Sequence, residues 1–117
     1  MKNRSASTQC CPPVLHAKLA ADDAAQLAQA FKAIADPARL RLLSFIAAQP
    51  SGEACVCHLN KPLDLAQPTV SHHLRVLFEA GLLERERRGT WVYYRIVSKR
   101  LAALRAALAP PARRSRA

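Results

Sequence analysis

The spacing of apolar residues changes at Gly81, from a period typical of a helix to one typical of strands. Before it, apolar residues recur at i, i+4 and i+7 from Val70, and glycine is common just past a helix C-terminus. After it, 82–87 and 91–97 are strand-like runs, the second rich in β-branched and aromatic residues. The sequence therefore predicts a helix that begins at Pro68 and is followed directly by a β-hairpin.

The hairpin and the helix before it carry much of the chain's positive charge. Lys and Arg number 18 against 8 Asp and Glu, a formal net charge of +10. Between residues 67 and 100, seven basic residues face three acidic ones, and Arg88, Gly89 and Thr90 make a basic hairpin tip. Such a balance favours a polyanionic partner, either nucleic acid or an acidic membrane.

Two helices are expected upstream. Asp22 and Asp23 can cap a helix over about 23–34, and Asp36 can cap a second one that ends before Pro50. The buried stripe expected on the second helix consists of Leu40, Leu43, Ile46 and Ala47.

A short third helix is expected over 54–61, ended by Pro62, and Ser98 can cap a last, strongly apolar helix. The fold expected is mainly α with a β-hairpin. One domain over 22–108 is predicted between a flexible arm, 1–21, and a basic tail, 109–117, because prolines interrupt both ends and no periodicity is seen there.

The start of the chain has no apolar run of signal-peptide length, and no stretch of eighteen apolar residues occurs. A soluble, cytoplasmic protein without a membrane partner is therefore expected. Because cytosolic thiols are kept reduced, cysteines in such a protein are more often metal ligands or redox sensors than structural disulfides.

Two short helices followed by a basic ribbon have the order of a winged helix-turn-helix, which inserts its second helix into the major groove. The alternative is an ordinary solvated helix face and hairpin. The candidate DNA-binding residues are Gln67, Thr69, Ser71, His72 and Arg75 on the helix, with Arg87 and Arg88 on the wing.

Four runs, in order, resemble the ArsR/SmtB family of metalloid- and metal-responsive repressors. They are Ile34 to Leu43 (IADPARLRLL), Cys55 to Leu59 (CVCHL), Gln67 to Leu74 (QPTVSHHL) and Arg88 to Tyr94 (RGTWVYY). The resemblance implies a homodimer, joined through its first and last helices, that binds operator DNA and releases it when an ion binds. It also implies that 67–75 is the recognition helix and that the Arg88–Gly89 turn is the wing tip.

Two positions depart from the family pattern. Relatives commonly have a capping Ser before the recognition helix, but this chain has Ala66, which removes about 1 kcal/mol of capping unless Asp64 or the loop compensates. His58 follows the Cys-x-Cys pair where Asp is frequent, so it can add a nitrogen ligand or simply face solvent.

The four cysteines, Cys10, Cys11, Cys55 and Cys57, are the candidate metal ligands. Residues two apart on an ideal helix point about 200° away from each other, so the second pair needs further donors. The arm pair can supply them by folding over the third helix of the same or the partner subunit. Soft thiolates favour thiophilic ions. Arsenite, which takes three sulfurs, fits Cys10, Cys11 and Cys55, whereas antimonite, cadmium and lead stay open.

The function expected is an arsenite-responsive repressor, and the resemblance to the arsenic- and antimony-sensing branch supports it. Alternatives are a cadmium or lead sensor of the same fold, a regulator that senses oxidation of Cys10 and Cys11, and a basic metal-buffering or RNA-associated protein. A thiol reductase is disfavoured, because the chain has no Cys-x-x-Cys pair and no Gly-rich phosphate loop, and no small organic substrate is expected. Cys55 and Cys57 can also be small buried hydrophobes.

Overall fold

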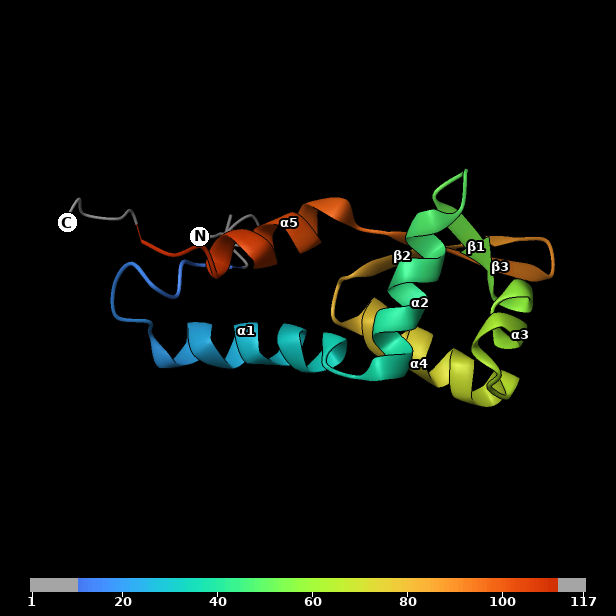
Figure 1. Cartoon of the computed structure of the whole chain (residues 1–117), viewed down its shortest axis with the longest axis horizontal. Coiled ribbons are helices and arrows are strands. Elements are labelled where there is room, and N and C mark those ends of the chain that lie inside the picture. The colour runs from blue at the N-terminus through green and yellow to red at the C-terminus, as the bar shows by residue number, and fades with distance from the viewer. Residues whose placement is uncertain (1–10, 112–117) are drawn as a thin grey trace.

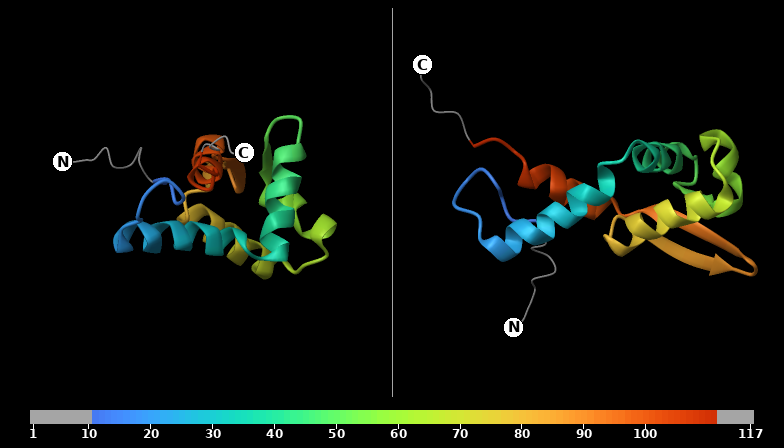
Figure 2. Two further views of the ribbon diagram at one scale, coloured as in Figure 1. Left: turned by 60° about the vertical axis from the view of Figure 1, so that its left-hand side comes forward. Right: turned by 90° about the horizontal axis from the view of Figure 1, so that it is seen from below.

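The computed structural model describes residues 11–111, and Figure 1 shows two helices reaching out from a mixed helical and stranded head. The elements are α1 (Ala21–Ile34), α2 (Pro37–Ala48), β1 (Glu53–Cys55), the 3-10 turn η2 (Val56–His58), α3 (Asn60–Leu63), α4 (Gln67–Glu79), β2 (Leu83–Arg88), β3 (Trp91–Ile96) and α5 (Ser98–Ala107). The paired helices α1 and α5 lie on one side, and the head contains α2, α3, α4 and the strands (Figures 1 and 2).

The order α3, α4, β2, β3 confirms the predicted winged helix-turn-helix. Residues Asp64 to Ala66 connect the two helices, and Asp64 adopts a left-handed conformation with φ of 54°. Gly81, with φ of 81°, follows α4 and lets the chain turn into β2. The predicted helix–hairpin transition at this glycine is therefore confirmed.

The helix starts agree with the sequence only in part. The Asp36 side chain accepts a hydrogen bond from the Arg39 backbone N–H at 3.1 Å, which is the expected cap of α2. In contrast, α1 begins after Ala20 and α5 after Val97, both without a side-chain cap. The predicted capping roles of Asp22, Asp23 and Ser98 are wrong, since the aspartates lie within the first turn of α1 and Ser98 is the first residue of α5.

The predicted set of buried residues on α2 is also partly wrong. Leu42 and Ile46 are fully buried, whereas Leu40 is 51% exposed and Ala47 is exposed. Apolar residues occupy most positions between Leu40 and Ile46, so helical spacing alone allows more than one buried face. The core that forms joins α2 to Val70, Leu74 and Leu77 of α4.

The third helix predicted over 54–61 does not form. The chain instead makes β1, the turn η2 and a four-residue α3 that contains Pro62. Proline is tolerated there because the first turn of a helix has no intrahelical partner for its amide. Cys55 therefore ends a strand, and Cys57 lies in a tight turn.

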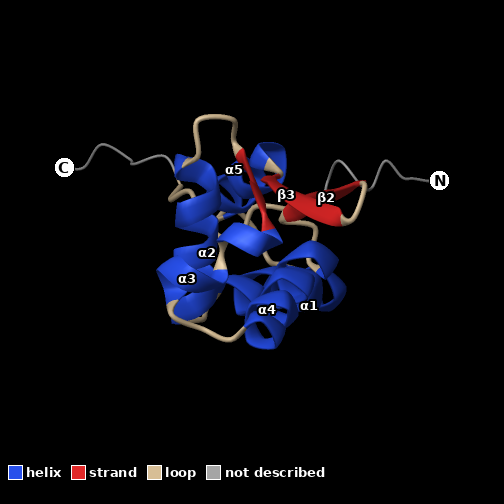
Figure 3. Cartoon of the chain, turned by 90° about the vertical axis from the view of Figure 1, so that its right-hand side faces the viewer, coloured by secondary structure: helices blue, strands red, loops and turns tan. Residues whose placement is uncertain are grey.

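The three strands form an antiparallel sheet in the order β1-β3-β2. Leu83 pairs with Ile96 and Arg88 with Trp91, while Cys55 pairs with Tyr93. One face of the sheet packs on the helices through residues such as Ala54, Leu83 and Tyr94, and Figure 3 shows the sheet lying to one side of the helical layer. The opposite face carries Glu53 and its cross-strand neighbours.

The described part of the predicted arm runs along the end of α5. The Val14 N–H donates to the Ala107 carbonyl at 2.9 Å, and Cys11 and Val14 pack against the core. Within residues 11–111, none of the helices is both long and apolar enough to cross a membrane. Cys10 and the tail arginines 113, 114 and 116 lie outside the described residues.

Candidate nucleic-acid interface and thiol site

The exposed side of α4 carries the predicted base-reading residues. Val70, Leu74 and Leu77 bury the opposite side of the helix. Each predicted contact residue on α4 is exposed: Gln67, Thr69, Ser71, His72 and Arg75. Because the opposite face of α4 is buried, these five polar side chains, which begin in the first turn of the helix, are accessible to a partner.

The first turn of α4 has no side-chain cap. Ala66 occupies the N-cap position with φ −67° and ψ 150°, and Pro68 follows in the first turn. Backbone amides at a helix N-terminus that lack an internal acceptor are donors for anions such as phosphate. The departure seen in the sequence at Ala66 is thus present in the structure, and within residues 11–111 the Asp64 side chain does not replace the missing cap.

Arg39 connects α4 to the helices before it. Its Nη1 lies 3.1 Å from Nδ1 of His73, and its Nε donates to the Ala33 carbonyl at the end of α1. A guanidinium can donate several hydrogen bonds in a fixed geometry. Arg39 therefore fixes the orientation of α4 relative to α1 and α2. The sequence alone does not predict this role, because Arg39 and its partners lie on three different helices.

The two predicted wing residues lie on opposite faces of the hairpin, because successive residues of a strand alternate. Arg87 is exposed on the face that it shares with Arg85, whose guanidinium lies 4.0 Å from the centre of the Phe78 ring. Arg88 is on the other face, and its guanidinium lies 4.3 Å from the centre of the Tyr93 ring.

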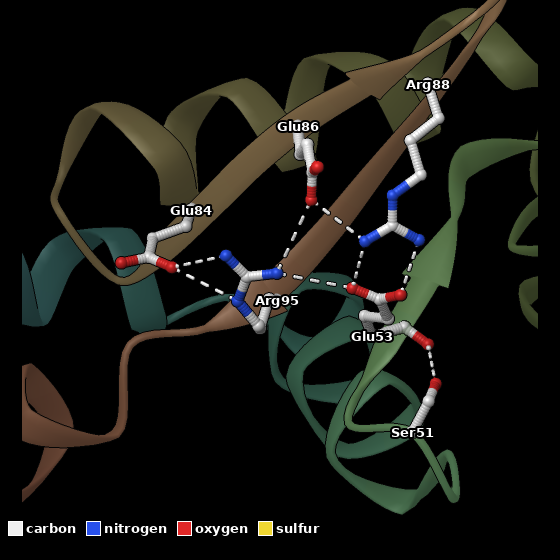
Figure 4. Close-up of polar contacts among 6 residues, drawn as sticks. All are labelled: Ser51, Glu53, Glu84, Glu86, Arg88 and Arg95. Carbon is white, nitrogen blue, oxygen red and sulfur yellow. Dashed lines mark hydrogen bonds and ion pairs between the residues drawn. The ribbon is translucent and has the colours of Figure 1, made fainter.

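Arg88 belongs to a cluster of charged side chains on the outer face of the sheet (Figure 4). Its two terminal nitrogens bind both carboxylate oxygens of Glu53 at 2.6 and 2.9 Å, and Nη2 also binds Glu86 at 2.9 Å. Arg95 binds Glu84 at 2.9 Å and Glu53 at 3.3 Å. Arg88 is therefore engaged within the chain, in addition to lying beside the wing tip.

These contacts change the proton affinity of the cluster. Hydrogen bonds from Arg88 lower the pKa of Glu53 and of Glu86, and both carboxylates in turn raise the pKa of Arg88. Glu84 raises the pKa of Arg95. The alternation of Glu84, Glu86 and Arg88 along β2 is the sequence signal that indicates a shared face of the strand.

Cys55 and Cys57 are joined as a disulfide, with their Cα atoms 5.2 Å apart. This differs from the reduced thiols and the 200° separation expected on a helix. The reason is local, since an extended residue followed by a 3-10 turn directs both side chains to one point. The Cys57 N–H also donates to the Cys55 sulfur at 3.3 Å. Because the backbone brings the Cys55 and Cys57 sulfur atoms together, the two thiolates can bind the same ion once the disulfide is reduced.

The two cysteines of this pair differ in their exposure to solvent. Cys55 is 1% exposed and Cys57 is half-buried, and the neighbouring His58 side chain is exposed. Among the described residues, no group of three or more His, Cys, Asp or Glu side chains could hold a metal ion. The pair is therefore not a complete three-donor site by itself within residues 11–111.

Cys11 lies elsewhere in the subunit. It lines a cleft of about 300 Å³ with residues of α1, α4 and α5, including Ala30, Glu79 and Leu104. Cys55 instead ends β1, in the head of the molecule (Figure 1). The structure therefore does not bring Cys11 together with Cys55 and Cys57 within this chain, and Cys10 lies outside the described residues.

Comparison with known proteins identifies the family. Residues 36–85 match the family described as "Bacterial regulatory protein, arsR family". An uncharacterized HTH-type transcriptional regulator of Methanocaldococcus jannaschii is 43% identical over 63% of this chain and 81% of that protein. The arsenic resistance transcriptional regulator ArsR1 of Pseudomonas putida is 50% identical over 56% of this chain, which spans half the length of that regulator.

Solved structures agree on the fold. A homodimeric winged helix-turn-helix DNA-binding domain from Mycobacterium bovis, a possible ArsR-family regulator, has a TM-score of 0.61 and 34% identity over 75% of this chain and 82% of its own. The AntR antimony-specific transcriptional repressor has a TM-score of 0.63 and 30% identity, with 79% of each chain covered. The fold is that of a winged helix-turn-helix transcriptional regulator. The chain belongs to the ArsR family.

Proposed function

We propose that this chain is a metalloid-responsive repressor, which binds operator DNA as a homodimer and releases it when arsenite or antimonite binds cysteine thiolates. The observation that carries the proposal is the convergence of the Cys55 and Cys57 sulfurs at the start of the helix-turn-helix. When reduced, they supply two soft donors to one ion. A repressor in this role acts in the cytoplasm and has no enzymatic activity.

The third sulfur is assigned to the arm, Cys10 or Cys11, of the partner subunit. Cys11 packs near α1 and α5 of its own subunit, away from β1, so an intramolecular site would require the arm to leave that cleft. A homodimer offers a second β1 and a second arm. The names of the Pseudomonas regulator and of AntR, which refer to arsenic and antimony, support the choice of a metalloid as the ion.

The DNA contacts are assigned to the exposed face of α4 and to the wing. Gln67, Thr69 and Ser71 lie in the first turns of α4, and His72 and Arg75 continue the same exposed surface. Arg87 and the tip residue Arg88 supply positive charge beside it. Short polar side chains at a recognition helix reach base edges, while arginines on a wing bind phosphate or a minor groove.

The test begins by selecting a preferred duplex from a random pool, since the operator is not known. Arsenite is then titrated into the reduced protein–duplex complex while fluorescence anisotropy is followed. We expect release of the duplex by the unmodified protein and little release for Cys55→Ser and Cys57→Ser. If both variants release DNA at the same arsenite concentration as the unmodified protein, the proposal is wrong.

A second experiment determines the ligand set. X-ray absorption on the arsenite-loaded protein gives the number of sulfurs around arsenic, and we expect three, falling to two in the variants that remove a ligand. Cys10→Ser and Cys11→Ser are measured separately, because only one of them need be a ligand. Cadmium and lead titrations on the same complex decide between metalloid and metal.

One observation favours a second candidate function, a thiol-redox regulator. Cys55 and Cys57 are already joined in the structure. In this case two thiols would give up two protons and two electrons to a peroxide, which is reduced to water and alcohol or to two waters. DNA release by peroxide with no response to arsenite would favour this function.

A further inference from the structure

The Glu53 side chain joins the two outer strands of the sheet across the central one. The strand order is β1-β3-β2, so β1 and β2 share no backbone hydrogen bonds. Arg88, the last residue of β2, extends over the Tyr93 ring of β3 and binds both carboxylate oxygens of Glu53 on β1. Figure 4 shows the Arg88 and Glu53 side chains facing each other. The bridge therefore connects β1 directly to the wing tip.

This ion pair is more constrained than an ordinary surface pair. The Glu53 side chain is 17% exposed, compared with 56% for Glu84 and 51% for Glu86. It also accepts from Arg95, so both arginines of the cluster meet at this one carboxylate. Bidentate arginine–carboxylate pairs have a defined direction, unlike most exposed ion pairs. Displacing Glu53 would thus displace Arg88.

Glu53 lies two residues before Cys55 on the same short strand. The backbone of Cys55 pairs with Tyr93, and the Tyr93 ring is the surface on which Arg88 lies. Two connections therefore lead from the thiol pair to the wing: the strand pairing to Tyr93 and the carboxylate of Glu53. Arg88 is also a candidate phosphate contact. Its guanidinium would therefore take part both in the bridge to Glu53 and in a bond to DNA.

We propose that Glu53 is a positioning residue that transmits the state of the Cys55–Cys57 pair to the DNA-binding wing through Arg88. The inference rests on the proposed function for its arsenite signal. A change at the pair moves the end of β1, Glu53 moves with it, and Arg88 takes a different position at the wing tip. Glu53 does not bind the ion or the DNA.

The chain offers a matched control. Glu53→Gln and Glu84→Gln each remove one negative charge from the same cluster. Glu84 lies on the hairpin, and among residues 11–111 its carboxylate bonds to Arg95 and not to Arg88, so its loss leaves the bridge from β1 to Arg88 intact. A general effect of charge would change both variants equally, whereas transmission through the bridge would change only Glu53→Gln.

The measured quantity is the ratio of the duplex dissociation constant with saturating arsenite to that without it. Arsenite binding is measured separately, as arsenic retained by the DNA-free protein. We expect Glu53→Gln to retain arsenic like the unmodified protein but to lower the ratio by about threefold or more, since couplings of this kind are typically 5- to 150-fold. Glu84→Gln should keep the ratio. An unchanged ratio in Glu53→Gln, or an equal fall in both variants, overturns the inference.

A second readout works without arsenite. Trp91, the only tryptophan, is 52% exposed and pairs with Arg88 across the hairpin, so its fluorescence reports the wing. Reducing the Cys55–Cys57 disulfide should shift this emission in the unmodified protein and in Glu84→Gln, with a smaller shift in Glu53→Gln. Equal shifts in all three proteins overturn the inference. Failure of the unmodified protein to bind arsenite overturns the proposed function alone, because this readout still decides the role of Glu53.

A double variant tests whether Glu53 acts on the wing through Arg88. If Glu53 acts through Arg88, adding Arg88→Gln to Glu53→Gln should not lower the arsenite-dependent ratio further, because both changes break the same bridge. Additive losses would show that Glu53 acts by another path and would overturn the assignment to Arg88. Circular dichroism and thermal melting of each variant establish that the fold is retained.

Discussion

Arg39 on α2 and His73 on α4 are joined, Nη1 to Nδ1, at 3.1 Å. The same guanidinium donates to the carbonyls of Ala33 and Lys32 at the end of α1. One side chain thus bonds to the C-terminal carbonyls of α1 and orients α4, the proposed recognition helix. Because a charged donor with fixed geometry makes these bonds, Arg39 should matter for both stability and DNA binding.

We predict that Arg39→Ala lowers the free energy of unfolding by about 2 kcal/mol, since several hydrogen bonds from a charged group are lost together. Urea denaturation measures this. Arg41→Ala is the matched control, because Arg41 makes one exposed hydrogen bond to the Pro62 carbonyl, and a change of about 0.5 kcal/mol or less is expected. Equal losses in the two variants would contradict the role assigned to Arg39.

The fold could be predicted where local signals act alone. Asp36 with Pro37, and Gly81 after α4, mark helix ends by their own chemistry, and the structure confirms them. In contrast, β1 exists because Glu53 to Cys55 pair with residues 93–95, about forty positions later. The local spacing of apolar residues does not reveal such a long-range pairing, so the sequence predicts a helix at Cys55 where the structure has a strand.

The sequence predicts a set of candidate site residues, but it does not predict their arrangement in space. The seven DNA-binding candidates are exposed in the structure, as their polar character predicted. The bond between Arg88 and Glu53 depends on the strand order, which brings β1 beside β3. The meeting of the Cys55 and Cys57 sulfurs depends on a strand end followed by a 3-10 turn.

The stability of α2 should depend on pH through Asp36. The backbone hydrogen bond from Arg39 lowers the pKa of Asp36 in the folded chain. A carboxyl group whose pKa is lower in the folded chain than in the unfolded chain stabilises the fold at pH values above its unfolded pKa, about 3.9. This stabilisation is lost as the pH falls through the folded pKa. We therefore predict that the stability difference between the unmodified protein and Asp36→Asn is largest at neutral pH and shrinks below about pH 4. Urea midpoints between pH 7 and 2.5 measure it. A difference independent of pH would contradict this reasoning.

Arg75 and Arg87 should affect DNA binding differently. Arg75 lies on the exposed face of the recognition helix, so Arg75→Ala should reduce the preference for the selected duplex over bulk competitor by about tenfold. Arg87→Ala should weaken binding to both, and should reduce the slope of log affinity against log salt by about one. Anisotropy titrations at several salt concentrations measure both quantities. Identical behaviour of the two variants would argue against separate base-reading and phosphate-binding roles.

The N-terminus of α4 should be open to stabilisation. Ala66 has the extended backbone of an N-cap, and no side chain accepts from the first-turn amides. We predict that Ala66→Ser raises the free energy of unfolding by about 1 kcal/mol, because the serine hydroxyl oxygen can accept one of these hydrogen bonds. Thermal and urea unfolding measure the gain.

Ala20 provides an unusually close control for this change. It is the N-cap of α1, also without a side-chain cap, and its φ and ψ, −67° and 150°, equal those of Ala66. Ala20→Ser should therefore give a similar gain in stability. Only Ala66→Ser should also change duplex affinity, since the first-turn amides of α4 are the ones that we propose to lie beside the DNA. If both variants shift affinity equally, the N-terminus of α4 does not contact phosphate, and capping acts only on the stability of the fold.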